Sequence, residues 1–173
     1  MRVAPEYRGG SGDPLLLLHG FTDTWRAWTP LLGHLEPHHE VLAPTLPGHH
    51  GGDVLPPDRE LTVEAATDRL EERMDAVGWD TAHIAGSSFG GWLALELARR
   101  EGAFGELTGI ACPVRIAYGE RDWLIPWPTA YERLERMLPD VEYVELPDCG
   151  HLPMWDEPEL VARTILDQTR PPT

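Results

Sequence analysis

Short apolar runs bounded by turn residues recur along the chain, and most are followed by a longer segment with helical periodicity. The first run is 15–18, four leucines that lie between Gly12-Asp13-Pro14 and His19-Gly20. A continuous apolar run of this length predicts a strand buried on both faces of a sheet. Further strands are predicted over 40–46, 81–85, 114–118 and 141–146, with one or two edge strands within 1–8.

Apolar residues three and four positions apart predict helices between these strands. One such pattern begins at Trp25 and ends at Leu35, and it predicts a helix over 24–35. The other predicted helices span 61–77, 89–100, 128–138 and 157–168. Thr62 is a suitable N-cap and Gly78 a suitable helix stop. This alternation is typical of an α/β protein whose mostly parallel, open sheet is covered by helices on both faces.

Length and charge limit the domain organisation and the partners. A chain of 173 residues fits one domain over 1–173. The net charge of −15 argues against binding to nucleic acid and against docking to an anionic membrane surface. None of the 14 basic residues is lysine, which excludes a Schiff-base mechanism and a Ser-Lys dyad.

Cysteine usage and the absence of targeting signals suggest a simple intracellular protein. Cys112 and Cys149 lack CxxC spacing and a cluster of zinc-type ligands. We therefore expect two buried free thiols, no metal and no cofactor. The N-terminus has no apolar stretch of signal-peptide length, and no apolar run reaches 18 residues, so we expect a soluble cytoplasmic protein.

The strongest chemical signal is the segment Gly86-Ser87-Ser88-Phe89-Gly90, which has the pattern Gly-x-Ser-x-Gly. It follows the predicted strand 81–85 and opens the predicted helix 89–100. A serine on such a sharp turn has strained backbone angles and projects its hydroxyl from the top of the sheet. The helix also directs its N-terminal dipole at any negative charge that forms nearby. Ser88 is therefore the predicted nucleophile.

A serine hydroxyl needs a base to take its proton, and position separates the candidate histidines. His151 follows the last predicted strand, so it lies on a loop at the carboxyl edge of the sheet, where open α/β sheets bind ligands. His34, His38 and His39 fall in a polar helix end and turn and are predicted to be solvated. His49 and His50 follow a Pro-Gly turn, and His83 lies within a strand. His19 is expected to brace its loop. We predict that His151 is the base.

A carboxylate is needed to hold the imidazole in one tautomer and to stabilise its charged form. Asp122 follows the predicted strand 114–118 and precedes His151, which gives the chain order Ser, Asp, His. Glu120 is the nearest alternative and Asp148 a more remote one. We predict that Asp122 is the acid.

Attack on a carbonyl carbon also creates an oxyanion, which requires fixed N–H donors. The N–H of Phe89, directly after the nucleophile, is the first predicted donor. The N–H of Phe21, in the loop after the leucine strand, is the second, because Gly20 lets the chain turn tightly there. Gly20, Trp25 and Trp123 are predicted to contact the substrate.

Five segments together resemble the α/β-hydrolase superfamily, in its esterase and haloperoxidase-like branch. They are Leu-His-Gly-Phe at 18–21, Leu-Pro-Gly-His at 46–49, Gly-Ser-Ser-Phe-Gly-Gly at 86–91, Tyr-Gly-Glu-Arg-Asp at 118–122 and Gly-His-Leu-Pro at 150–153. The resemblance runs from about residue 15 to residue 168. It implies a serine hydrolase, and its motifs are specific for the fold rather than for the substrate.

The sequence departs from the family between the nucleophile and the acid. Family members usually carry a further strand and a helical cap there, and the segment 101–111 is too short and too rich in glycine for either. We therefore expect a lidless core that lacks one central strand, with an open groove, modest affinity and broad selectivity. Apolar surface without its cover would favour a homo-oligomer.

Two functions are consistent with these residues. The first is a carboxylesterase that cleaves small acyl esters through an acyl-enzyme intermediate. The α/β-hydrolase superfamily, which the sequence resembles, also contains C–C bond hydrolases, perhydrolases and lyases with the same triad. Its haloalkane dehalogenases have aspartate at the nucleophile position, so Ser88 argues against that branch. The second is a catalytically weak or inactive remnant that serves as a binding or structural module, because a fold does not guarantee a function.

Overall fold

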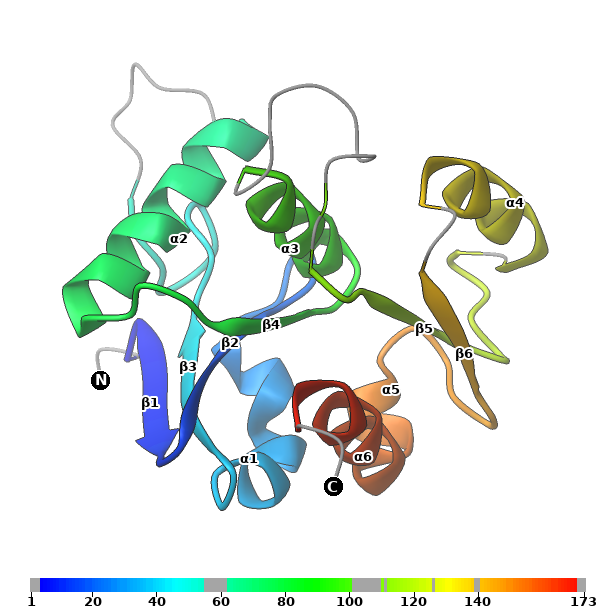
Figure 1. Cartoon of the computed structure of the whole chain (residues 1–173), viewed down its shortest axis with the longest axis horizontal. Helices are drawn as coiled ribbons and strands as arrows, with labels where there is room; N and C mark the ends of the chain where they lie inside the picture. Colours follow the sequence, from blue (N-terminus) through cyan, green and yellow to red (C-terminus); the bar gives the residue numbers. More distant parts are fainter. Residues whose placement is uncertain are drawn as a thin grey trace. The chain divides into compact units, whose positions relative to one another are not determined.

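The computed structural model describes residues 4–54, 62–100, 110, 112–125, 127–138 and 141–170. The chain forms two compact units, an N-terminal unit that ends at Leu97 and a C-terminal unit that begins at Ala98 (Figure 1). Strands and helices alternate along the chain, so the predicted α/β class is confirmed. The single domain predicted for 1–173 stays a prediction.

The N-terminal unit is built on a four-stranded sheet with the order β1-β3-β2-β4. Its strands are β1 (Glu6–Gly10), β2 (Asp13–Leu18), β3 (His39–Pro44) and β4 (His83–Gly86). Strand β2 is parallel to β3 and to β4, and only the edge strand β1 runs antiparallel. All four leucines of β2 are fully buried, as the continuous apolar run predicted.

Helices cover both faces of this sheet (Figure 1). They are the short 3-10 helix η1 (Trp25–Trp28), α1 (Thr29–Leu35), α2 (Val63–Val77) and α3 (Phe89–Arg100). Leu16 and Leu18 pack with α2 and α3 through Leu70 and Leu93. Because side chains alternate across a strand, Leu15 and Leu17 point to the opposite face of the sheet, on the side of α1.

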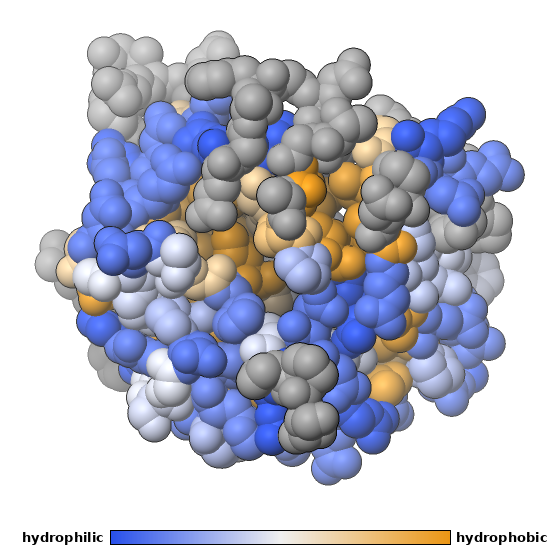
Figure 2. Space-filling view, in the orientation of Figure 1, coloured by the Kyte–Doolittle hydropathy of each residue, from blue (hydrophilic) through white to orange (hydrophobic). Residues whose placement is uncertain are grey.

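Local sequence signals explain where these helices begin and end. Thr62 caps α2 by accepting a hydrogen bond from the N–H of Ala65, and Gly78 ends it in the left-handed conformation, as predicted. The outer surface of α2 is hydrophilic (Figure 2). The single helix predicted over 24–35 is wrong, because a 3-10 turn precedes α1. Pro30 lies at the start of α1, and it has no N–H to continue the helical ladder.

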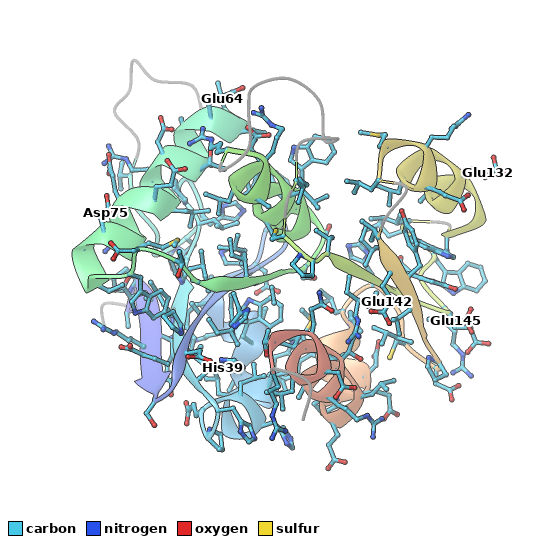
Figure 3. The ribbon with its side chains drawn as sticks, viewed as in Figure 1. His39, Glu64, Asp75, Glu132, Glu142 and Glu145 are labelled. Carbon is cyan, nitrogen blue, oxygen red and sulfur yellow. The ribbon has the colours of Figure 1, made fainter. Side chains whose placement is uncertain are left out.

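The C-terminal unit contains the parallel pair β5 (Arg115–Gly119) and β6 (Glu142–Leu146). Its helices are α4 (Trp127–Met137), the short α5 (Pro153–Asp156), which was not predicted, and α6 (Pro158–Thr169). The guanidinium of Arg115 pairs with Glu142 and donates to the carbonyl of Thr164 on α6. Glu142 and Glu145 both lie on β6 (Figure 3).

Several further expectations have definite outcomes. His39 is buried, so its predicted solvation is wrong: β3 begins at this residue, and the polar turn ends one residue earlier. Cys149 is buried, but Cys112 is exposed because it lies in the bend that precedes β5. The predicted loss of a cap and of a strand falls on 101–111, which apart from Ile110 lies outside the described residues. No helix among the described residues has the length and apolar character needed to span a membrane.

Candidate active site

Ser88 lies on the turn that joins β4 to α3, and its backbone is in the left-handed region, with φ of 52°. This conformation costs a non-glycine residue about 1–3 kcal/mol, so surrounding contacts must hold it. The N–H of Ser87 donates to the carbonyl of Leu18 on β2 at 2.9 Å, and the N–H of Gly90 donates to the carbonyl of Ser87 at 2.8 Å. The result is an exposed serine on a fixed turn.

Close backbone packing explains the two glycines of the Gly-x-Ser-x-Gly pattern. A Cβ at Gly86 would overlap the carbonyl of Gly90, and a Cβ at Gly90 would overlap the carbonyl of Leu18 on β2. Helix α3 therefore approaches β2 and β4 more closely than any side chain at these positions would allow. This close contact explains why glycine stands at both ends of the Gly-x-Ser-x-Gly pattern.

The loop after β2 lies directly against Ser88. The position of a Cβ on Gly20 would be only 3.5 Å from the Cβ of Ser88. The rings of Phe21 and Phe89 meet edge to face, with centroids 6.2 Å apart. Phe89 opens α3, and the first N–H groups of a helix have no acceptor within it. The peptide N–H groups of Phe21 and Phe89 thus belong to two segments that meet at Ser88.

His19 holds this loop in place, as the sequence predicted. Its ring is fully buried, and burial lowers the pKa of the imidazole below its ordinary value. Its Nδ1 lies 2.7 Å from the carbonyl of Gly20, and its Nε2 accepts the N–H of Leu46 at 2.8 Å. A carbonyl only accepts, so Nδ1 carries the proton and both ring nitrogens are satisfied.

In the C-terminal unit, the imidazole of His151 contacts the carboxylate of Asp122. His151 Nδ1 lies 2.9 Å from Asp122 Oδ2, and Oδ1 accepts the N–H groups of Leu124 and Ile125 at 2.9 and 3.0 Å. Burial alone would raise the pKa of Asp122, but these hydrogen bonds outweigh it and the pKa is lowered. An ionised Asp122 takes the Nδ1 proton as its partner, which leaves Nε2 of His151 as the basic nitrogen.

The two alternative acids have other partners. The carboxylate of Glu120 accepts the N–H of Asp148 at 3.0 Å, and the side chain of Asp148 pairs with Arg121. The N–H of Arg121 also donates to the carbonyl of Cys149 at 2.8 Å. These bonds join the loop after β5 to the loop after β6. No signal in the sequence pointed to this bracing of Asp122 against His151.

Apolar side chains around the His–Asp pair are exposed. Trp123 is 93% exposed and directly follows Asp122, and Trp155 is half exposed on α5. The other exposed apolar residues of these two loops are Leu124, Ile125 and Leu152. Trp25, also predicted to contact substrate, packs instead on the β1 side: its indole N–H donates to the carbonyl of Ala4 and its ring stacks on Tyr7.

Comparison with known proteins decides the family. A profile of the alpha/beta hydrolase family matches residues 15–106, which is more than half of the chain. The chain belongs to the alpha/beta hydrolase family. A second profile, described as the alpha/beta hydrolase fold, matches residues 99–158. The resemblance drawn from the five sequence segments is therefore confirmed.

Relatives of this alpha/beta hydrolase carry several names. Epoxide hydrolase EphH of Mycobacterium tuberculosis is 52% identical over 51 residues, 30% of this chain and 23% of that protein. The pimeloyl-[acyl-carrier protein] methyl ester esterase of Aromatoleum aromaticum is 40% identical over 86 residues, 50% of this chain and 31% of that protein. The chain therefore spans about a third or less of the length of the curated relatives it matches.

The fold has close structural neighbours. Carboxylesterase CesB from Bacillus subtilis matches with a TM-score of 0.81, over 94% of this chain and 86% of that chain. The sequences are only 16% identical, so this likeness shows the fold alone. Within the described residues, no group of three or more His, Cys, Asp or Glu side chains is arranged to hold a metal ion.

Proposed function

We propose that the chain is a serine hydrolase, specifically a carboxylesterase for small acyl esters, with Ser88, His151 and Asp122 as its catalytic triad. The observation that carries this proposal is the exposed Ser88 held at φ of 52° between β4 and α3. Such strain is retained only where surrounding packing imposes it, and it is characteristic of functional sites. The His151–Asp122 hydrogen bond supplies the oriented imidazole that a serine nucleophile needs.

In the proposed acylation step, Oγ of Ser88 attacks the ester carbonyl carbon while Nε2 of His151 takes its proton. The carbonyl oxygen becomes an oxyanion, which the N–H groups of Phe21 and Phe89 stabilise. The bond between the carbonyl carbon and the alcohol oxygen then breaks. The departing alcohol takes the proton from His151, and the acyl group stays on Ser88.

Deacylation repeats these steps with water as the nucleophile. His151 takes a proton from the water, whose oxygen attacks the acyl carbon. The bond to Oγ breaks, Ser88 regains its proton and the carboxylic acid leaves. Throughout, Asp122 fixes the tautomer of His151 and stabilises its charged form without accepting its proton.

The surroundings of the His–Asp pair favour an uncharged, partly apolar substrate. Trp123 and Leu124 are exposed next to Asp122, and they could contact the apolar part of an ester. The net charge of −15 disfavours anionic substrates. The name of the esterase relative is consistent with this choice.

Hydrolysis of 4-nitrophenyl acetate tests the proposal. The wild type should release nitrophenol, and Ser88→Ala should lower kcat by a factor on the order of 10⁶ if the triad acts as a unit. The neighbouring serine provides a matched control, since Ser87→Ala removes a hydroxyl from the same turn and should retain most of the activity.

Hydrolysis that Ser88→Ala does not affect would remove Ser88 from the mechanism. Absence of hydrolysis for every ester tested, with the chain folded, would instead favour the second function, a binding or structural module on a hydrolase fold. A survey of acyl chains of increasing length, run with the same two variants, measures how much apolar substrate the site accepts.

A further inference from the structure

His49 lies in a tightly turned loop. This loop contacts the loop after β2, which carries Phe21 with its proposed oxyanion donor and is called the oxyanion loop below. Its N–H donates to the carbonyl of Leu46 at 3.1 Å, and its own carbonyl accepts the N–H of Gly52 at 3.0 Å. The imidazole packs edge to face on His19, with centroids 5.0 Å apart, and on Phe21, with centroids 5.7 Å apart. The backbone therefore fixes His49, and its ring touches both residues that shape the oxyanion loop.

One nitrogen of this imidazole has no partner among the described residues. Nδ1 lies 3.2 Å from the carbonyl of Pro47, which can only accept, so in the neutral ring Nδ1 carries the proton and Nε2 is an acceptor. Nε2 is buried and makes no hydrogen bond with any described residue. The neighbouring His19 differs, because both of its nitrogens are bonded. An unsatisfied buried polar group costs about 1–3 kcal/mol and calls for an explanation.

We propose that Nε2 of His49 is a specificity atom, which accepts a hydrogen bond from a hydroxyl or N–H carried by the substrate. The inference rests on the proposed ester hydrolysis and narrows its substrate class to esters that bear such a donor. Phe21, the ring packed on His49, is 69% exposed, so it can turn aside without disrupting the core.

The order of the rings indicates where the donor should be. Phe21 lies between His49 and Phe89, with centroid distances of 5.7 and 6.2 Å to them. A substrate whose carbonyl is at Phe89 must therefore extend past Phe21 to reach His49. The donor should lie several bonds from the reacting carbonyl rather than on the adjacent carbon.

Paired esters measure this preference directly. In one series, 4-nitrophenyl hydroxyalkanoates with the hydroxyl at successive carbons are each compared with the alkanoate that has methyl in its place. In a second series, hydroxyalkyl acetates are compared with alkyl acetates, which distinguishes a donor on the alcohol part from one on the acyl part. At the best chain length, the wild type should favour the hydroxyl ester in kcat/KM by about tenfold.

Three variants link the preference to Nε2. His49→Phe keeps the ring contacts but removes the acceptor, so the ratio of kcat/KM values should fall to near one. His49→Gln keeps an acceptor oxygen and should retain part of the preference. His50→Phe changes the exposed neighbour and should keep the wild-type ratio. His49→Phe should also unfold at no lower temperature than the wild type, because it removes an unsatisfied buried nitrogen.

A wild-type ratio near one at every chain length in both series would overturn the inference while leaving Ser88-dependent hydrolysis intact. An unchanged ratio in His49→Phe would overturn it as well. Loss of the preference in His50→Phe would show that the effect does not come from Nε2. Absence of Ser88-dependent hydrolysis on all esters would overturn the proposed function, and this inference with it.

Discussion

The turn that carries Ser88, the proposed nucleophile, lies in the N-terminal unit and is called the nucleophile turn below. It and the His–Asp pair of the C-terminal unit hold their side chains by different means. Ser88 is held by close packing of backbone on backbone, which only glycine permits at positions 86 and 90. His151 and Asp122 are held by hydrogen bonds within one loop, such as those of the Leu124 and Ile125 N–H groups to the Asp122 carboxylate. A further hydrogen bond, from the N–H of Asp148 to Glu120, joins the two loops. One arrangement is steric and buried, and the other is polar and partly exposed.

This difference implies different sensitivities to mutation. Overlap of atoms in a packed interior raises the energy of the whole fold, so changes at the nucleophile turn should affect stability first. A changed hydrogen-bond partner next to His151 changes which nitrogen of its imidazole carries the proton. Such a change leaves the fold largely unaffected. Activity and stability should therefore separate between the two regions.

Among the variants that test this comparison, Asp122→Asn should have the largest effect. The amide oxygen can still accept the N–H groups of Leu124 and Ile125, which places the NH₂ group against His151 Nδ1. Nδ1 must then give up its proton, and Nε2 carries it instead, so His151 can no longer accept the proton of Ser88. We expect kcat for 4-nitrophenyl acetate to fall by about 10³–10⁴-fold, with little change in the unfolding temperature.

Glu120→Gln is the matched control, because it makes the same change of carboxylate to amide two residues earlier in the same loop. Its amide oxygen can still accept the N–H of Asp148, so activity should stay within a few-fold of the wild type. Equal losses in the two variants, or retained activity in Asp122→Asn, would contradict the assignment of Asp122 as the partner of His151.

The contrast between the regions also explains what could be predicted from the sequence. The nucleophile turn was predictable because the glycines on both sides of Ser88 are a local signature of close packing. The acid could be predicted only as a choice between Glu120 and Asp122, since both follow the same strand. What separates them is a set of contacts between distant segments, such as the N–H of Asp148 with Glu120, which leave no pattern in the sequence.

Errors arose where one residue at an element boundary decided the outcome. His39 was assigned to a polar turn, but it is the first residue of β3 and pairs in register with Asp13. Pro30 divides a helical pattern whose apolar spacing continues across it. That Nε2 of His49 has no hydrogen-bond partner in the described part of the chain could not be foreseen, because it depends on how one turn packs against the loop after β2.

A second, smaller effect tests the steric side of the comparison. In Gly90→Ala the new Cβ would overlap the carbonyl of Leu18, so α3 or β2 must shift. We expect a loss of about 3 kcal/mol in the free energy of unfolding, measured by denaturant titration. Gly33→Ala is the control: it lies in α1, and nothing is within 4 Å of its added Cβ. It should gain about 0.5–1 kcal/mol. Similar values for the two variants would contradict the close-packing explanation.

The smallest expected effect is a pH dependence of the free energy of unfolding, to which His39 of the N-terminal unit and Asp122 of the C-terminal unit contribute in different pH ranges. His39 is labelled in Figure 3. Burial holds the pKa of His39 below its ordinary value, and its Nδ1 bonds to the carbonyl of Asp13. Below pH 6.5, the ordinary pKa of a histidine, the side chain of His39 binds a proton in the unfolded chain but stays neutral in the folded chain. Stability is therefore complete above that pH and is lost as the pH falls towards the folded pKa.

Asp122 affects stability only at a much lower pH than His39 does. Its pKa is lowered, so it stays ionised until the pH falls below its ordinary pKa of 3.8. Between pH 7.5 and 5.5, the free energy of unfolding should thus decrease through His39, and through the similarly buried His19, while Asp122 contributes nothing. His39→Gln should flatten this slope without abolishing it, whereas His50→Gln, on the surface, should keep it. A slope that His39→Gln leaves unchanged would mean that the acid sensitivity arises elsewhere than at the start of β3.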